Sequence, residues 1–233
     1  MTSASGERVR GISSMAMRHV LAELGGAYES RTRRPVVVEA VGGIDAARRV
    51  ADGEAFDFVV LAADAIDRLA ASGRVDAASR TELARSGIAV AVAAGTARPV
   101  IDDEAAVRDA IVRAKSVGYS TGPSGDHLLR LLERWGIAAD VAPRLVRAKA
   151  GVPVATLLAQ GDVELGFQQL SELMCMAGVD VVGPLPATIQ QPTVFAAAVC
   201  TAARQAPAAH ALLTFLASPL ADPMIRRHGM EPA

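Results

Sequence analysis

Short apolar runs alternate with helix-period runs along almost the whole chain. In the first part, strands are predicted at residues 8–13, 35–40 and 56–62, and helices at 15–29, 45–52 and 65–72. Within the predicted helices, apolar residues recur at every third or fourth position. Strands that alternate with helices are typical of a mostly parallel sheet with helices on both faces, so the pattern predicts an α/β protein.

A second series of elements begins with a strand predicted at residues 87–94. It continues with helices at 103–114, 125–135, 152–160 and 170–176 and strands at 116–120, 163–167 and 179–182. A strand at 193–201 and helices at 207–217 and 219–228 then end the chain. We therefore expect two lobes, one of residues 1–91 with 193–233 and one of 92–192. Two crossing strands would join them, with a ligand cleft between them and hinge closure on the ligand.

The charge balance limits the classes of partner. The 233 residues carry a formal net charge of -1, whereas a nucleic-acid surface needs a clear basic excess. Aromatic residues make up 3% of the chain, too few for stacking platforms for bases. We expect no nucleic-acid partner.

The N-terminal stretch lacks the apolar run of a signal peptide, because Glu7, Arg8 and Arg10 interrupt it. No stretch approaches the roughly 18 apolar residues of a membrane span. We therefore expect a cytoplasmic protein that makes no membrane contact by itself. An ABC permease partner, which requires export, is not expected.

Several chemistries lack their sequence signatures. Cys175 and Cys200 have neither metal-site nor redox spacing, which favours two buried free thiols. No H-x-x-x-H or carboxylate–histidine cluster indicates a metal site. The glycine-rich stretch VGYSTGPSG has neither P-loop nor G-x-G-x-x-G spelling, and GPSGD is not a nucleophile elbow. We expect neither a metal nor a cofactor.

Four predicted strand-to-helix turns consist mainly of glycine or hydroxyl residues. Their distinctive residues are Ser13 and Ser14, Gly42 and Gly43, Ser124 and Gly125, and Gly151 with Val152. In open α/β sheets ligands bind at the carboxyl ends of strands, where helix N-termini present unpaired N–H groups. Such turns would bind a small anion by hydrogen bonds and helix dipoles rather than by arginine.

Each of these residues also has a purely structural interpretation. Ser13 or Ser14 would then be an N-cap, the glycine pair would permit a tight turn, and Ser124 with Gly125 would only start a helix. The recurrence of the pattern at four turns favours a shared ligand.

At these motifs the chain resembles the type II periplasmic binding proteins, in particular the molybdate-binding proteins of ABC transporters. The resemblance runs from about residue 9 to the C-terminus through ISSMAM, GEAFDFVVLA, VGYSTGPSG, GDVELGFQQLSEL and VVGPLPATIQQPTVFAAAV. It implies a two-lobed α/β fold of that type with a ligand cleft between the lobes.

The resemblance also places ligand positions on this chain. The family's first serine matches Ser14, its second falls on Gly42 or Gly43, and its third small residue matches Ser124. Its next apolar position matches Val152, and a tyrosine of molybdate binders falls on Gln169. The pair Gln168-Gln169 offers both donors and acceptors, which suits an organic carboxylate better than a tetrahedral oxyanion. Binding of a small organic (poly)carboxylate is therefore the leading prediction, and a molybdate-binding transport component is an alternative.

The phrases GFQQLSEL and GPLPATIQ are similar to a divergent branch that includes aconitate isomerase-like proteins. This similarity implies a second alternative, an isomerase that moves a proton across an unsaturated polycarboxylate. Such an enzyme needs an acid/base residue, for which Glu172, His127 and Tyr119 are the candidates. Their structural interpretations are a solvated helix face, a first helical turn and a core position, respectively.

Overall fold

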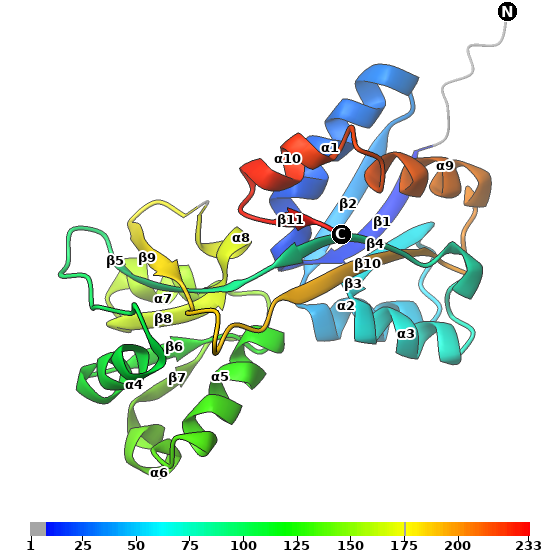
Figure 1. The fold of residues 1–233 in the computed structure, drawn as a ribbon. Coiled ribbons are helices and arrows are strands. Elements are labelled where there is room, and N and C mark those ends of the chain that lie inside the picture. Colours follow the sequence, from blue (N-terminus) through cyan, green and yellow to red (C-terminus); the bar gives the residue numbers. More distant parts are fainter. Residues whose placement is uncertain (1–7, 175) are drawn as a thin grey trace, which may run out of the picture. The chain divides into compact units, whose positions relative to one another are not determined.

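The structure is a computed structural model that describes residues 8–174 and 176–233 (Figure 1). Cys175, predicted to be a buried thiol, lies outside the described residues. The chain forms two compact units, one of residues up to Arg85 together with Val194–Ala233 and one of Ser86–Thr193. Each contains its own sheet.

The first unit contains a six-stranded sheet with the order β11-β4-β10-β3-β1-β2. Its strands are β1 (Val9–Ser14), β2 (Val36–Val41), β3 (Phe58–Ala62), β4 (Thr81–Ser86), β10 (Thr193–Val199) and β11 (Glu231–Pro232). Strands β1, β2 and β3 are parallel, and Ser14 pairs with Val41 in the register. Their carboxyl ends therefore lie at one edge of the sheet.

Helices cover both faces of this first sheet, as Figure 1 shows. They are α1 (Arg18–Thr32) after a 3-10 turn η1 (Met15–Met17), α2 (Gly43–Ala51), α3 (Ala63–Ala71), α9 (Ala206–Leu216) and α10 (Asp222–Arg227), with a further turn η2 (Ala77–Ser79). On one face α1, α9 and α10 bury a core around Phe58 and Val60. On the other, α2 and α3 pack over Ile12 and Leu61. The alternation of side chains along β3 separates these two cores.

The second unit contains a five-stranded sheet with the order β7-β6-β8-β5-β9. Its strands are β5 (Ile88–Ala93), β6 (Val117–Tyr119), β7 (Leu145–Arg147), β8 (Leu165–Gln169) and β9 (Val179–Pro184). Strands β6, β7 and β8 are parallel, so their carboxyl ends also share an edge. Strand β5 lies wholly in this sheet, so the unit begins at Ser86 rather than near residue 92.

The helices of the second unit are α4 (Glu104–Arg113), α5 (Pro123–Arg134), α6 (Ala138–Val141), α7 (Val154–Gln160) and α8 (Leu170–Leu173), with a 3-10 turn η3 (Ala142–Arg144). Helices α4 and α5 pack on one face around Phe167. Helices α7 and α8 pack on the other around Leu158 and Leu173. The carboxyl edge of the sheet therefore receives loops that lead into α5, α7 and α8.

The sheets differ from the predicted mostly parallel arrangement, because both are mixed. Strand β10 is antiparallel to β3, and β5 is antiparallel to both β8 and β9. Strands β5 and β10 stand next to the two points at which the chain leaves one unit and enters the other. A chain that only alternates strands and helices has no reason to reverse a strand, so the periodicity did not show these reversals.

Candidate functional site

Ser14 ends β1 at the carboxyl edge of the first sheet. It occupies the N-cap position before η1, yet its side chain makes no capping hydrogen bond. Its hydroxyl oxygen is buried without a hydrogen-bond partner among the described residues, and the residue is 9% exposed. The neighbouring Ser13 is fully buried and donates its hydroxyl to the Ser14 carbonyl at 3.2 Å. The Ser14 hydroxyl is thus unsatisfied by the fold, and the N-cap interpretation does not account for it.

The glycine pair lies next to Ser14, at the end of the neighbouring strand β2. Gly42 is the N-cap of α2, with φ -56° and ψ 136°, and Gly43 is the first helical residue. A β-carbon on Gly43 would lie 3.7 Å from the Ser14 β-carbon, an ordinary contact distance. Gly43 is not in the left-handed region either. A β-carbon at Gly43 would therefore fit, so neither its backbone conformation nor a close contact of that atom requires a glycine here.

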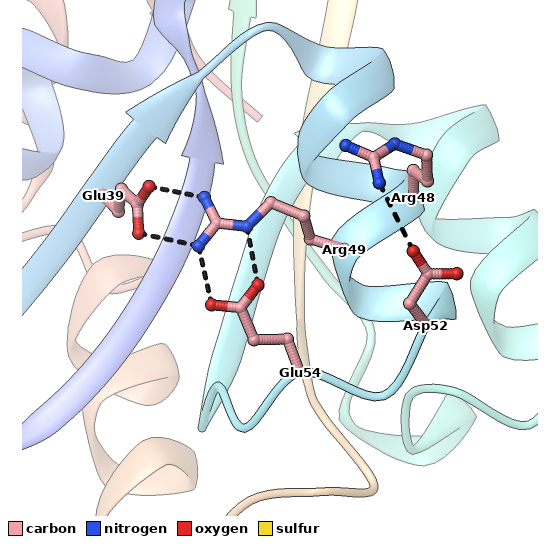
Figure 2. Close-up of polar contacts among 5 residues, drawn as sticks. All are labelled: Glu39, Arg48, Arg49, Asp52 and Glu54. Carbon is pink, nitrogen blue, oxygen red and sulfur yellow. Dashed lines mark hydrogen bonds and ion pairs between the residues drawn. The ribbon is translucent and has the colours of Figure 1, made fainter.

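An ion-pair network fastens α2 to β2 on either side of this turn (Figure 2). Arg49 of α2 bonds both carboxyl oxygens of Glu39, one at 3.0 Å, and both oxygens of Glu54, at 2.6 and 2.7 Å. These bonds hold the pKa values of both carboxyl groups below their usual range. Because Glu39 precedes the Gly42–Gly43 turn and Arg49 follows it, the network helps to fix the direction in which α2 begins.

In the second unit, the loop between β6 and α5 brings two serine hydroxyls together. The oxygens of Ser120 and Ser124 lie 2.8 Å apart, and Ser120 also accepts a bond from the Gly122 N–H at 3.3 Å. Ser124 is buried at the second position of α5, after Pro123. Helix α5 starts two residues earlier than predicted, because proline is well suited to a first helical position.

Gly125 is required by a close approach of the backbone in this loop. A β-carbon at Gly125 would lie 1.9 Å from the carbonyl oxygen of Ser120. Any other residue would push the loop away from the helix. Gly125 lies in the first turn of α5, in agreement with its structural interpretation. The close approach of its backbone also keeps Ser120 next to Ser124.

The fourth turn, between β7 and α7, is built differently from the prediction. Gly151 has φ 76°, a conformation that favours glycine. The Val152 N–H donates to the Lys149 carbonyl at 2.9 Å, and the residue is 36% exposed. Helix α7 begins at Val154 instead of Val152, after the extended N-cap Pro153. The backbone N–H of Val152 is thus engaged in a turn.

Gln168, near the end of β8, links α7 to Glu172. Its buried side-chain oxygen accepts the Val154 N–H at 2.7 Å, and its amide nitrogen donates to Oε1 of Glu172 at 2.7 Å. The amide therefore caps the start of α7 and holds the carboxyl group of Glu172. The sequence predicted a ligand contact for Gln168. These bonds give it a positioning role, which was not predicted.

Glu172 lies on the short helix α8, which directly follows β8. The residue is half-buried, and burial of the carboxyl group raises its pKa to about 7, although the Gln168 hydrogen bond lowers it in part. The second carboxyl oxygen, Oε2, accepts no hydrogen bond from the described residues. Glu172 is therefore partly buried and hydrogen-bonded to Gln168, rather than fully solvated.

Gln169 is the last residue of β8 and is 2% exposed. Its amide nitrogen donates to the Thr193 hydroxyl at 2.7 Å, while its side-chain oxygen is buried without a partner among the described residues. The two ends of an amide are assigned from their hydrogen bonds. Because a hydroxyl can donate as well as accept, rotation of the amide would leave an N–H free instead.

The other two acid/base candidates have more ordinary surroundings. His127 lies in the first turns of α5, with Nε2 2.7 Å from the Ile189 carbonyl and Nδ1 buried without a partner. The carbonyl requires Nε2 to carry a proton, so the histidine is anchored to the loop before β10. Tyr119 is partly buried against the core of the second unit, in agreement with its structural interpretation.

Two site residues, Ser120 and Thr193, were missed from the sequence. Ser120 belongs to the glycine-rich stretch itself, so its hydroxyl next to GPSG was an available signal. Thr193 opens an apolar strand, and nothing local distinguishes it. Its contact with Gln169 joins positions 24 residues apart, which periodicity does not report.

A large hollow in the second unit lies at the opposite edge of its sheet. It has a volume of about 800 Å³ and is lined by residues 92–93, 96–100, 161 and 163–165 among others, near the amino ends of β6 and β8. Residues 8–174 and 176–233 contain no group of histidine, cysteine and carboxylate side chains able to hold a metal ion. Within the same residues no helix is long and apolar enough to cross a bilayer. At the carboxyl edge of each sheet, the polar groups without partners among the described residues are the candidate ligand-binding groups.

Known proteins resemble the chain over nearly its whole length. Residues 9–231 match the family model of bacterial extracellular solute-binding proteins. An aconitate isomerase from a Pseudomonas species is 35% identical over 227 residues, which cover 95% of this chain and 86% of the relative. A molybdate-binding protein of Azotobacter vinelandii is 28% identical over 137 residues, 55% of this chain and 53% of that protein.

A solved structure supports the same assignment at the level of the fold. The periplasmic molybdate-binding protein of Azotobacter vinelandii matches with a TM-score of 0.81 and 19% identity, covering 95% of this chain and 98% of that one. The predicted resemblance and the predicted α/β class of fold are therefore confirmed. The chain belongs to the bacterial extracellular solute-binding protein family, with the fold of the type II periplasmic binding proteins.

Proposed function

We propose that the protein binds a small organic polycarboxylate, and that Ser14, Ser124 and Gln169, each at the carboxyl edge of its own sheet, are ligand-binding residues. The observation that carries the proposal is that buried polar atoms remain unsatisfied at both carboxyl edges. The Ser14 hydroxyl and the Gln169 side-chain oxygen lack partners. A buried polar group without a partner costs about 1–3 kcal/mol, and a polar ligand would remove that cost.

The chemistry of these groups favours a carboxylate over a tetrahedral oxyanion. An oxyanion accepts hydrogen bonds only, whereas the Gln169 amide and a protonated Glu172 both accept and donate. A polycarboxylate presents oxygens that are ionised or protonated according to their surroundings. The family resemblance places a serine at Gly42 or Gly43, and neither glycine supplies a hydroxyl. The donor set is thus suited to several separate carboxyl groups.

The relatives support the anion class and favour a carboxylate. The Azotobacter proteins are named for binding molybdate, so an oxyanion remains the competing ligand. The relative that matches over 95% of this chain is named for its action on aconitate, an unsaturated tricarboxylate. Aconitate is therefore the first ligand to test.

A second candidate function is isomerisation of the same ligand by proton transfer. The observation that favours it is Glu172, a carboxyl group with a pKa near 7 at the end of β8. A general acid/base works best with a pKa near the operating pH.

One experiment separates these functions. Calorimetric titration with cis-aconitate, trans-aconitate, the saturated tricarballylate and molybdate measures binding, and proton NMR follows the cis/trans ratio with time. Binding of the tricarboxylates without a change in the ratio supports a binding protein. A change in the ratio supports the isomerase. Saturable binding of molybdate alone would exclude both candidates and leave an oxyanion-binding protein.

A further inference from the structure

We propose that Glu172 is the residue that transfers the proton, and that Gln168 positions it by bonding to the Val154 N–H and to Glu172 at the same time. The proposal rests on the proposed polycarboxylate ligand and its isomerisation. It assigns different roles to two hydrogen-bonded residues of the second unit, proton transfer to Glu172 and positioning to Gln168.

The geometry makes the two oxygens of Glu172 unequal. Oε1 accepts the Gln168 amide at 2.7 Å, whereas Oε2 has no partner among the described residues. Gln168 is itself held at its other end by the Val154 N–H at 2.7 Å. Because Gln168 is 2% exposed and lies within the central strand β8, the amide has little freedom to move. One carboxyl oxygen is thus fixed, and the other is left to exchange a proton.

The other candidates fit this role less well. His127 uses Nε2 to donate to the Ile189 carbonyl, and its Nδ1 is buried. Tyr119 packs against the core of its unit. Glu172 has both a free oxygen and an anchored one.

The chemical step balances without a metal, a cofactor or a second reactant. The ionised Oε2 removes a proton from the methylene carbon between a carboxylate and the double bond. The electron pair of that carbon–hydrogen bond delocalises over the three-carbon allyl system and the attached carboxylates. Glu172, now protonated, returns the proton to the far carbon of the allyl system, and the double bond moves by one position with either geometry. The enzyme ends in its starting state.

Gln168 would act through Glu172 rather than on the ligand. Its hydrogen bond to Oε1 favours the ionised form, while burial favours the neutral form. Removal of the amide should therefore raise the pKa of Glu172 further, and the acid limb of the pH–rate profile should move to higher pH. A merely structural role for Gln168 would lower the amount of folded protein without moving that limb.

The test measures binding and proton exchange separately. Each variant is incubated with trans-aconitate in D2O, and NMR records proton exchange, defined here as conversion to cis-aconitate together with any deuterium that enters when the proton on Glu172 exchanges with solvent before its return. Calorimetry measures the affinity. Glu172→Gln should bind trans-aconitate at least as well as the wild type and lose exchange at least hundredfold, the lower part of the range for general acid–base catalysis. Gln168→Met should keep some exchange with its acid limb displaced upward. The matched control is Glu133→Gln, the same change on the exposed face of α5, which should alter neither quantity.

The possible results separate the proton-transfer role of Glu172 from the binding function of the protein. If Glu172→Gln binds trans-aconitate and exchanges within tenfold of the wild type, Glu172 is not the base, although the binding function stands. If the wild type binds no tricarboxylate, the proposed function itself falls. If Glu172→Gln does not fold, proton exchange is measured in Glu172→Ala with and without formate, a small carboxylate that can replace the deleted group. Exchange that depends on formate supports the role, and full exchange without formate overturns it.

Discussion

The hydroxyl oxygens of Ser120 and Ser124 lie 2.8 Å apart at the start of α5. Each hydroxyl has one hydrogen, and their mutual bond uses only one of the two. The remaining hydrogen has to find a third acceptor, whichever serine donates to the other. The pair therefore presents one hydroxyl donor next to the N-terminus of α5, where the helix dipole favours an anion.

Replacement of Ser124 by alanine should weaken binding of trans-aconitate by about tenfold to a hundredfold. This corresponds to the roughly 1.5–3 kcal/mol of a hydrogen bond to a charged group. Calorimetry of Ser124→Ala against Ser30→Ala, an exposed helical serine of α1, measures the effect. A lowered unfolding midpoint with unchanged affinity would show that Ser124 only caps its helix.

Ser14→Ala should reduce affinity by a similar factor while leaving the free energy of unfolding unchanged or higher. The reason is that the Ser14 hydroxyl is buried without a partner and makes no capping bond. Removal of a true N-cap costs about 1 kcal/mol of stability, so chemical denaturation distinguishes the two roles. Stability lost by that amount would contradict the assignment of Ser14 to the ligand.

Gly43→Ser should fold normally and shift preference toward oxyanions. A β-carbon fits there, 3.7 Å from the Ser14 β-carbon, and the new hydroxyl would add a donor beside the Ser14 hydroxyl. A thermal-shift titration with molybdate should give a larger rise in melting temperature for Gly43→Ser than for the wild type. The control is Gly26→Ser in α1, where a β-carbon meets open space. Equal shifts for both variants would refute the expectation.

Gly125→Ala should cost about 1–3 kcal/mol of stability and also weaken ligand binding. The added carbon would lie 1.9 Å from the Ser120 carbonyl oxygen, so the loop has to move away and the Ser120–Ser124 pair separates. Urea denaturation compared with Gly26→Ala, which has room for its methyl group, isolates the steric effect. A Gly125→Ala protein as stable as the wild type would mean that the loop relaxes freely.

The stability of the protein should depend on pH through Glu172. Its pKa is raised in the folded protein from 4.5 to about 7, so the folded state holds the proton more tightly than the unfolded state. This contribution is fully present below about pH 4.5 and is lost as the pH rises through about 7. Glu172→Gln should therefore match the wild type near pH 5 and exceed it by up to about 3 kcal/mol near pH 8. A difference that does not change with pH would show that the carboxyl group is not buried.

Most of the fold could be predicted from the sequence, because the core helices and strands carry strong periodic patterns. Strand β4 escaped prediction, since its sequence TELARS has no apolar alternation and its pairing depends on strands far along the chain. The three-residue strand β7 and the one-turn helix α6 are too short to show a period. Such elements are determined by tertiary packing rather than by local propensity.

The candidate site was predicted in part, to the extent that it depends on local turn chemistry. Ser14, Gly43, Ser124 and Gly125 occur in glycine- and hydroxyl-rich turns, and such turns are visible in a sequence. The state of Glu172 was not visible, because burial and the bond from Gln168 arise only when β8 is placed between β5 and β6. The engaged N–H of Val152 likewise depends on a loop conformation that no pattern specifies.

The proposed ligand contacts would use mainly main-chain N–H groups and small hydroxyls at the strand ends, which has a consequence for how the protein evolves. Main-chain donors persist under almost any substitution, so the capacity to bind an anion is inherited with the fold itself. The choice among anions then depends on the residues at a few positions, such as 43, 169 and 172. A lineage with this fold needs few substitutions to exchange one ligand, or one chemistry, for another.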